Sequence, residues 1–206
     1  MKSVQKAPRD TQAMSGIDQA RTLYYDFFAG CFLYPLLEGR AGLLQEQIGL
    51  FKSSPLEDVV AQNFERLHEE LEANGVENLL KEYDDIFMIP MKGEMVLPYV
   101  SHYKEGRLNG EILVDIRQTL KALPIRRNEK IFKETEDHLG YLFLMMRYCV
   151  EGKAFVVEEQ EIFNTYISPV IKTFMDEVKE HSLANHYKDI IQILEGFMAF
   201  EREYLK

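Results

Sequence analysis

The segment 134–138, with the sequence Glu-Thr-Glu-Asp-His, gathers side chains that could perform acid–base chemistry or bind a charged group. Asp137 and His138 are adjacent, and Glu134 lies four positions before the histidine. A carboxylate can pair with a cation or orient an imidazole, and an imidazole can donate or accept a hydrogen bond. Two interpretations are open at this stage: a structural pair near a helix start, or part of a binding site.

Helical spacing predicts that this segment belongs to a long apolar helix. Asn128 is a candidate N-cap, and we expect the helix to extend to Gly152. One side of it would carry residues three or four positions apart, namely Ile131, Thr135, His138, Leu142 and Met145. His138 would therefore face the core, and the apolar residues from Leu139 onward would be core as well.

A metal site would need further ligands at fixed spacing. A di-metal carboxylate site in a helical bundle uses two Glu-x-x-His pairs and two more glutamates. This chain has one pair with that spacing, Glu65 with His68. A metal-dependent helical-bundle enzyme that uses Glu65, His68 and either Glu134 or His138 is retained as an alternative.

The sequence lacks the other common catalytic patterns. It has no Gly-rich phosphate loop ending in Lys-Ser/Thr and no Gly-x-Ser-x-Gly nucleophile elbow. Cys31 and Cys149 lie in apolar helical patterns, without a Cys-x-x-Cys motif or a Cys/His cluster. We therefore predict a protein with no catalytic residues, no metal and no cofactor, and with reduced, buried thiols.

The elements that must position these residues are predicted to be helices. Apolar residues recur three or four positions apart along most of the chain, and no stretch keeps the two-residue period of a strand. The expected helices cover residues 15–34, 37–51, 55–74, 76–87, 110–123, 128–152, 155–182 and 183–205. Their start and end signals are Ser15, Pro35, Ser54-Pro55, Asn74-Gly75 and Ser168-Pro169. The predicted fold class is all-α: a flexible N-terminal tail at 1–14, then a single globular helical bundle at 15–206.

One long internal loop interrupts the helical pattern, at residues 88–109. It contains Pro90, Gly93, Pro98 and Gly106, together with the aromatic-polar patch 98–103. A connection of this length inside a compact domain is unusual, and long ordered loops are often functional. We therefore expect the loop to contribute to a site.

Composition and charge narrow the function classes. The chain of 206 residues has 24 Lys and Arg against 34 Asp and Glu, a net charge of −10, which argues against a nucleic-acid partner. The longest uncharged apolar run, residues 27–37, is too short to span a bilayer, which takes about 20 residues. The N-terminal residues lack the apolar core of an export signal. We expect a soluble, cytoplasmic protein.

The acidic residues concentrate between Pro55 and Pro90, where ten Asp and Glu oppose Arg66 and Lys81. This acidic segment is either a solvated helix face or an electrostatic attraction for a basic partner. At its end, Tyr83, Ile86 and Phe87 have the spacing of core residues. They would also form a groove for a helical peptide that is basic and then apolar, the composition of a twin-arginine export signal.

Three motifs in order carry a family resemblance. They are Tyr-x-x-Ile-Phe at 83–87, Pro-Tyr-x-Ser-x-Tyr at 98–103, and Glu-Thr-Glu-Asp-His at 134–138 before an apolar helix. Together they resemble the TorD/DmsD/NarJ family of redox-enzyme maturation chaperones. The chain departs from the family pattern at Thr135, where proline is usual, at Tyr83 and Tyr99, where some branches have tryptophan, and at Leu142, which is often glutamate.

The resemblance implies an all-helical chaperone without catalytic activity, either a monomer or a domain-swapped dimer. It would bind the twin-arginine leader, or the apo-form, of a molybdopterin-containing oxidoreductase subunit, and aid cofactor insertion and proofreading before export. The implied leader-binding residues are Tyr83, Ile86, Phe87, Pro98, Tyr99, Ser101, Tyr103, Glu134, Asp137 and His138.

On this hypothesis the acidic segment attracts the leader's arginines, which finally pair with carboxylates such as Asp137. The leader's apolar part would pack on Tyr83, Ile86, Phe87 and Tyr99, and His138 would orient Asp137 or donate to a leader carbonyl. The second alternative is an acidic helical adaptor that uses its charged face for a basic protein without any leader.

Overall fold

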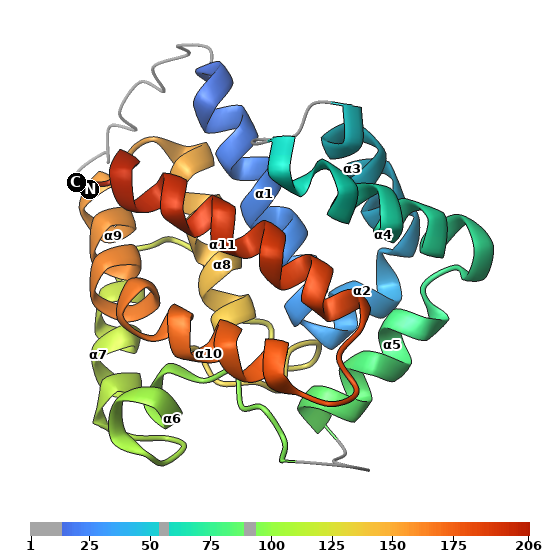
Figure 1. Cartoon of the computed structure of the whole chain (residues 1–206). Coiled ribbons are helices and arrows are strands. Elements are labelled where there is room, and N and C mark those ends of the chain that lie inside the picture. The colour runs from blue at the N-terminus through green and yellow to red at the C-terminus, as the bar shows by residue number, and fades with distance from the viewer. Residues whose placement is uncertain (1–13, 54–57, 89–93) are drawn as a thin grey trace, which may run out of the picture.

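The computed structural model describes residues 14–53, 58–88 and 94–206, and their secondary structure is helical (Figure 1). Within these ranges no strand forms, and an isolated bridge pairs Tyr99 with His138. The all-α prediction is therefore confirmed. Residues 1–13 of the expected tail, the expected start signal Ser54-Pro55 and positions 89–93 of the expected loop lie outside the described residues.

The helices differ in length, and short ones connect longer ones. In chain order they are α1 (Gly16–Phe32), α2 (Tyr34–Gly39), α3 (Ala41–Ser53), the 3-10 turn η1 (Asp58–Val60), α4 (Ala61–Asn74), α5 (Glu77–Tyr83), the π-helical turn η2 (Asp84–Met88), α6 (Val100–Glu105), α7 (Glu111–Leu120), α8 (Leu139–Gly152), α9 (Val156–Glu161), the π-helical turn η3 (Ile162–Ile167), α10 (Ser168–Glu180) and α11 (His186–Tyr204). None of the described helices is both long and apolar enough to cross a bilayer.

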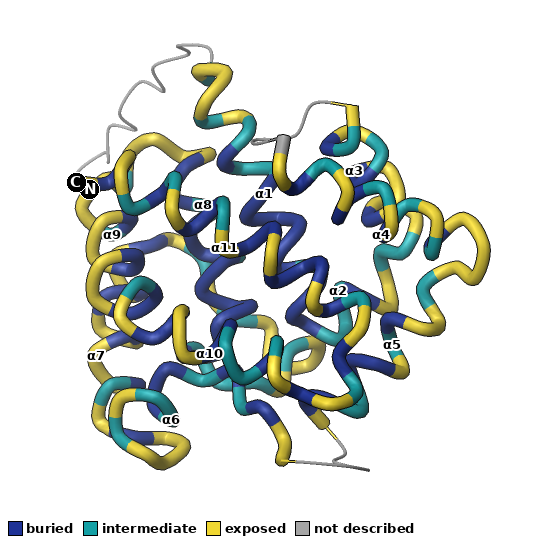
Figure 2. Tube along the Cα trace, in the orientation of Figure 1, coloured by how far each residue is buried: buried dark blue, intermediate teal, exposed yellow. Residues whose placement is uncertain are grey.

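The aromatic first helix lies at the centre of the fold. As predicted, Ser15 caps α1, and its hydroxyl accepts a hydrogen bond from the Asp18 amide at 3.0 Å. α1 packs most extensively against α8, while α11 crosses in front of both (Figure 1). The buried parts of these three helices form the interior in Figure 2. Aromatic residues of α1 fill that interior: Tyr24, Tyr25, Phe27, Phe28 and Phe32.

A glycine allows α1 and α8 to approach closely. A Cβ atom at Gly140 would lie 3.0 Å from the carbonyl carbon and oxygen of Phe32 and 2.9 Å from the Leu33 side chain. Real Cβ contacts with backbone are longer, so any larger residue would force the two helices apart. The start of α8 is therefore fixed against the end of α1.

The predicted start of the long helix at Asn128 is wrong, because α8 begins eleven residues later, at Leu139. The Asn128 side chain accepts a hydrogen bond from the Lys130 amide at 3.1 Å and so stabilises a turn. Ile131, predicted on the core side, is 51% exposed. Thr135 lies ahead of the helix, so the shared face predicted for Ile131, Thr135 and His138 does not form.

The expected loop at 88–109 contains α6, so the patch 98–103 is largely helical and not irregular. The helix predicted at 37–51 divides into α2 and α3, which meet at Arg40. Pro35 occupies the first turn of α2, where its missing amide donor is harmless, and α1 ends before it at Phe32.

Candidate binding site

Asp137 joins two of the three motifs from inside the protein. Its side chain is fully buried. One carboxylate oxygen accepts hydrogen bonds from the Ser101 hydroxyl at 2.5 Å and the Ser101 amide at 3.2 Å. The other accepts from the Thr135 hydroxyl at 2.5 Å. Asp137 thus fixes the first turn of α6 against the segment that precedes α8, where a carboxylate also suits the helix amides.

Backbone hydrogen bonds strengthen the same junction. The Val100 amide donates to the Asp137 carbonyl at 2.9 Å, and the Leu139 amide donates to the Pro98 carbonyl at 2.8 Å. This pairing sets Tyr99 beside His138, with the two rings edge to face at 4.9 Å between centroids. The second and third motifs therefore form one unit, although thirty residues separate them.

His138 is the N-cap of α8. Its Nδ1 accepts a hydrogen bond from the Gly140 amide at 3.1 Å. Burial lowers the pKa of His138 to about 3, because a buried imidazolium would lose its hydration. The ring is therefore neutral, with its proton on Nε2. The core-facing position predicted for His138 is confirmed, since it is 1% exposed.

The first motif packs behind this unit. The Val96 amide donates to the Ile86 carbonyl at 2.9 Å, which ties the π-helical turn η2 to the chain entering α6. The Tyr83 hydroxyl donates to the Phe32 carbonyl at 3.2 Å, and Phe87 packs against Tyr187 with ring centroids 5.2 Å apart. The side chains of the first motif are thus core residues in this conformation.

Tyr99, Tyr103 and Glu134 form the partly exposed side of the junction. Burial, then the nearby charges of Glu134 and Asp137, raise the pKa of Tyr99 to about 12. The same Glu134 charge acts with burial to raise the pKa of Tyr83, which places Glu134 near residues of all three motifs. The Oε2 atom of Glu134 is buried and has no hydrogen-bond partner among the described residues.

The ten predicted leader-contact residues therefore meet in one region, but they are not equally accessible. Tyr83, Ile86, Ser101, Asp137 and His138 are at most 2% exposed. A peptide cannot reach these side chains while the protein has this conformation. The direct pairing of Asp137 with an arginine, expected from the sequence, is replaced here by the internal bonds to Ser101 and Thr135.

The acidic segment contains a structural residue that its sequence did not reveal. Glu82 is buried, and its carboxylate accepts hydrogen bonds from the backbone amides of Asn185, His186 and Tyr187 at 2.6, 3.1 and 2.8 Å. These amides begin α11, so Glu82 caps that helix across about one hundred residues of sequence. Glu82 is not part of a solvated acidic face.

An acidic cleft of about 430 Å³ lies beside the junction and was also missed from the sequence. The extended residues 94–96 and His102 of α6 form one side. The other side is the end of α10 and the residues after it, with the lining side chains Glu177, Glu180, His181 and Ser182. The Tyr103 hydroxyl donates to Glu177 at 2.7 Å, and this links the cleft to the second motif.

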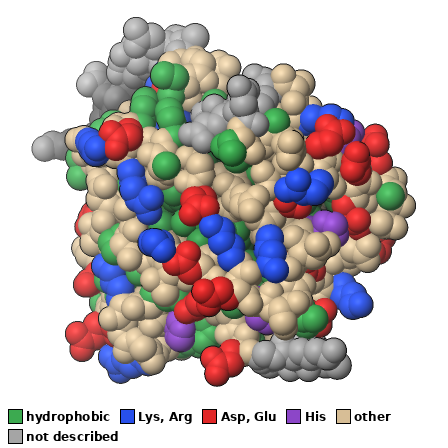
Figure 3. Space-filling model, viewed as in Figure 1, with side chains coloured by type: hydrophobic (Ala, Val, Ile, Leu, Met, Phe, Trp, Pro, Cys, Tyr) green, Lys and Arg blue, Asp and Glu red, His purple; other side chains and the backbone are tan. Residues whose placement is uncertain are grey.

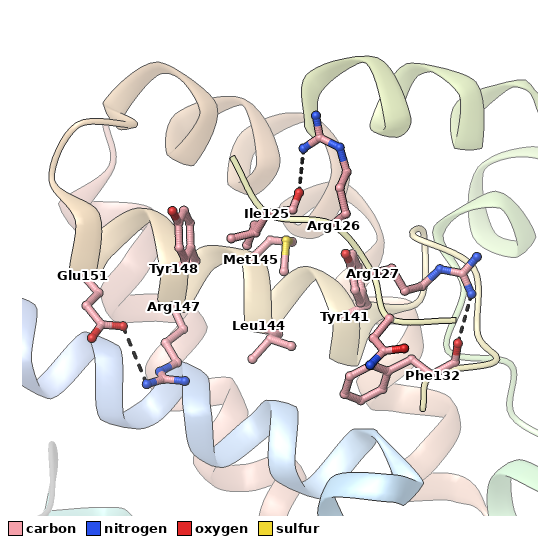
Figure 4. A pocket seen from close by; sticks show the side chains of 11 residues that line it. Ile125, Arg126, Arg127, Phe132, Tyr141, Leu144, Met145, Arg147, Tyr148 and Glu151 are labelled. Atoms are coloured by element: carbon pink, nitrogen blue, oxygen red, sulfur yellow. Dashed lines mark hydrogen bonds and ion pairs between the residues drawn. The ribbon is translucent and has the colours of Figure 1, made fainter. Parts of the chain in front are cut away.

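A second cleft, of about 220 Å³, follows α8 on its outer face (Figure 4). Tyr141, Leu144, Met145 and Tyr148 form its apolar floor. The arginines at its rim are already bound within the protein. Arg126 donates to the carbonyls of Leu123 and Ile125, in the segment after α7. Arg127 donates to the Phe132 and Glu134 carbonyls at 3.1 and 2.8 Å. Arg147 pairs with Asp26 and Glu151. The cleft thus lacks free cations for an anionic ligand.

The described part of the chain contains no group of three or more His, Cys, Asp or Glu that could hold a metal ion. Of the residues in the metal-enzyme alternative, Glu65 pairs with Lys52 at 2.9 Å and His68 lies 3.3 Å from Glu72. His138 uses Nδ1 to cap α8. These contacts give that alternative no structural support.

Comparison with known proteins identifies a matching family model and a solved structure with a similar fold. The family model described as nitrate reductase delta subunit matches residues 54–178, which include all three motifs. The crystal structure of a proposed redox enzyme maturation protein from Archaeoglobus fulgidus is similar, with a TM-score of 0.55 and 17% identity over 95% of this chain and 99% of that one. At this identity the likeness shows the fold. No curated protein sequence gives a significant match.

Proposed function

The chain belongs to the nitrate reductase delta subunit family of NarJ- and TorD-type chaperones, and we propose that it binds the twin-arginine leader of a molybdenum oxidoreductase. Family membership makes it a redox-enzyme maturation chaperone. Our proposal adds that it acts in the cytoplasm as one helical domain at 15–206. It holds the apo-subunit until its cofactor is inserted, and it catalyses no reaction itself.

The observation that carries this proposal is the junction of the three motifs. Buried contacts join 83–87, 98–103 and 134–138 and hold a partly exposed surface of Tyr99, Tyr103 and Glu134. Glu134 forms no ion pair with a described lysine or arginine, and its buried Oε2 atom has no hydrogen-bond partner among the described residues. A carboxylate in that position suits an incoming guanidinium.

The buried motif residues support that surface and do not touch the leader. Asp137 and His138 fix the position of Tyr99, and Tyr83, Ile86 and Phe87 pack beneath it. Exposed methionines lie near the junction, with Met88 54% and Met95 39% exposed. Methionine adapts to varied apolar partners, so these side chains suit the apolar half of a leader.

The expected affinity is moderate. Burial of two or three apolar leader side chains contributes about 1.5–3 kcal/mol each, and association entropy offsets much of this, which leaves roughly micromolar binding. Binding of this strength suits a partner that must be released for export. The net charge of −10 also favours encounter with a basic peptide over a nucleic acid.

The direct experiment is co-purification of the full-length chain with twin-arginine leaders fused to an inert carrier protein. We expect retention of the Arg-Arg leader, reduced several-fold by Tyr99→Ala and by Glu134→Gln. Glu38→Gln, an exposed acid on α2 with no ion pair in the described structure, is the matched control and should retain the leader fully. Equal retention of a carrier without a leader would contradict the proposal and favour the acidic adaptor.

A further inference from the structure

The acidic cleft gathers three carboxylates, those of Glu94, Glu177 and Glu180. Glu177 and Glu180 are one turn apart at the C-terminal end of α10, so they share a face of the helix. The last carbonyls of a helix carry partial negative charge, which adds to the field of both carboxylates. Glu94 faces them from the extended segment across the cleft. Figure 3 shows acidic and histidine side chains together around α10 on the lower part of the molecule.

These carboxylates lack cationic partners within the described residues. No ion pair joins Glu94, Glu177 or Glu180 to a described lysine or arginine. Other carboxylates, those of Glu136, Asp189, Glu195 and Glu201, each pair with one. Lys179 lies between the two helix acids in sequence but pairs with Glu195 of α11 at 2.5 Å. The cleft therefore concentrates negative charge that the protein does not itself neutralise.

His181 supplies a second and independent sign of a ligand. It is 7% exposed and lines the cleft, and its Nδ1 accepts a hydrogen bond from the Leu183 amide at 3.3 Å. The proton of the neutral ring is therefore on Nε2, which is buried and has no acceptor among the described residues. A buried donor without an acceptor is unfavourable, so a ligand carbonyl would stabilise it.

We infer that this cleft binds an arginine of the leader, with its guanidinium on Glu177 and Glu180 and a leader backbone carbonyl on His181 Nε2. The inference rests on the proposed function and assigns one of the leader's two arginines to the cleft, the other being the guanidinium that Glu134 suits. A planar guanidinium can bond two carboxylates at once, which an ammonium cannot do with the same geometry. Among the described residues, the cleft side chains do not form a metal-binding group.

The surroundings of the cleft match the rest of the leader. Met95 lines it and is 39% exposed, which offers an apolar contact next to the charged one. The chain that supplies Glu94 and Met95 continues directly into Pro98 and Tyr99 of the junction. A peptide that is basic and then apolar would therefore follow this segment from the cleft to the junction.

The test measures the affinity of the full-length protein for fluorescently labelled Arg-Arg leaders of molybdenum oxidoreductases and for the same peptides with Gln-Gln. Glu177→Gln/Glu180→Gln removes the charge, keeps the side-chain shape and leaves an acceptor for Tyr103. We expect it to weaken Arg-Arg binding at least about tenfold and Gln-Gln binding hardly at all. The control Glu38→Gln/Glu46→Gln removes equal charge from exposed sites on α2 and α3 and should change neither.

The outcomes separate this inference from the proposed function. If the wild type prefers Arg-Arg and Glu177→Gln/Glu180→Gln keeps that preference, the arginine lies elsewhere, and the inference is overturned while the proposed function stands. If the wild type binds neither peptide, both are overturned. If the control variant weakens binding as much as the cleft variant, the effect is net charge alone, and the assignment of the cleft is again overturned.

The histidine contact has its own readout. His181→Asn keeps an acceptor for the Leu183 amide and removes the Nε2 donor, and we expect it to weaken both peptides about fivefold. In the full-length wild type, addition of the Arg-Arg leader should shift the NMR signals of the His181 ring. A ring that does not respond at saturating leader would overturn the carbonyl contact, since a purely structural histidine gives that result.

Discussion

The structural role of His138 depends on the residues that it and Asp137 contact. Sequence spacing correctly predicted that His138 is buried, and it left open whether the Asp137–His138 pair is structural or part of a binding site. The partners of the pair, Ser101 and Gly140, could not be predicted, because Ser101 is distant in sequence and Gly140 was assigned to the helix interior. The pair connects α6 to the start of α8, and our proposal places the leader contacts on its partly exposed neighbours.

The depressed pKa of His138 predicts a dependence of stability on pH. Between its ordinary value near 6.5 and its folded value of about 3, the unfolded chain binds a proton that the folded chain does not. The free energy of unfolding should therefore fall as the pH is lowered through this window, by about 2 kcal/mol at pH 5 relative to pH 7.5. Urea unfolding at several pH values measures this loss.

His138→Asn is the reference for that measurement. Asparagine is a good N-cap and can accept from the Gly140 amide, but it does not titrate. The wild type should lose more stability than the variant between pH 7.5 and 5. Parallel pH profiles for the two proteins would show that the imidazole is not held neutral by the fold.

Glu82 gives the second prediction at the level of single residues. Glu82→Ala would leave the Asn185 and Tyr187 amides without their acceptor, and we expect a loss of about 1–3 kcal/mol in the free energy of unfolding. Glu46→Ala removes an exposed glutamate from α3 and should change stability by less than about 0.5 kcal/mol. Equal free energies of unfolding for the two variants in urea titrations would show that Glu82 does not stabilise the start of α11.

At the level of elements, the sequence predicted which segments are helical better than it predicted the residues at which the helices begin and end. Amphipathic periodicity identified α1, α4, α7, α10 and α11 because each buries one continuous stripe. It failed at 128–138, where Arg127 donates to the Phe132 and Glu134 carbonyls and the backbone pairs with the chain before α6. Such long-range competition for backbone groups leaves no periodic signal. The π-helical turn η2 was hidden for the same reason.

Gly140 allows a test of how α8 is positioned. Gly140→Ala places a methyl group against the backbone of Phe32, and we expect a loss of about 1–3 kcal/mol through overpacking. Gly30→Ala is the matched control, since no atom lies within 4 Å of its added Cβ. That change in the last turn of α1 should instead stabilise the protein, by up to about 1 kcal/mol.

Thermal or urea unfolding of these two glycine variants decides the point. Opposite signs of the stability change would support a close approach of α1 and α8 at Gly140. Stabilisation by both substitutions would contradict it, because alanine would then act only through its helix propensity.

At the level of the whole molecule, the three motifs lie within the residues that match the family model, and the packing of the helices brings these motifs into contact. Buried ion pairs of Arg21 in α1 help to hold the surrounding helices together. Its guanidinium bonds Glu201 of α11 and Glu159 of α9 inside the protein. The bonds join helices from both ends of the chain, so the junction and the acidic cleft lie on a firmly packed support.

Sequence alone identified the three motifs of the proposed site but not which of their side chains are accessible. The motifs contain the residues that build the junction, and these are also the most buried ones. The cleft residues Glu177, Glu180 and His181 carry no motif and come together with Glu94 only through the packing of α10 against α6. A site made by such packing leaves no local pattern in the sequence.

The central claim, that this chaperone captures a twin-arginine leader through charge and apolar contact together, can be tested by one calorimetric titration. Full-length wild-type protein is titrated with an Arg-Arg leader of a molybdenum oxidoreductase and with its Gln-Gln counterpart. Roughly micromolar binding of the first, at least about tenfold weaker binding of the second and a loss of this difference at high salt are predicted. Equal affinity for both peptides, or no heat from either, would contradict the account.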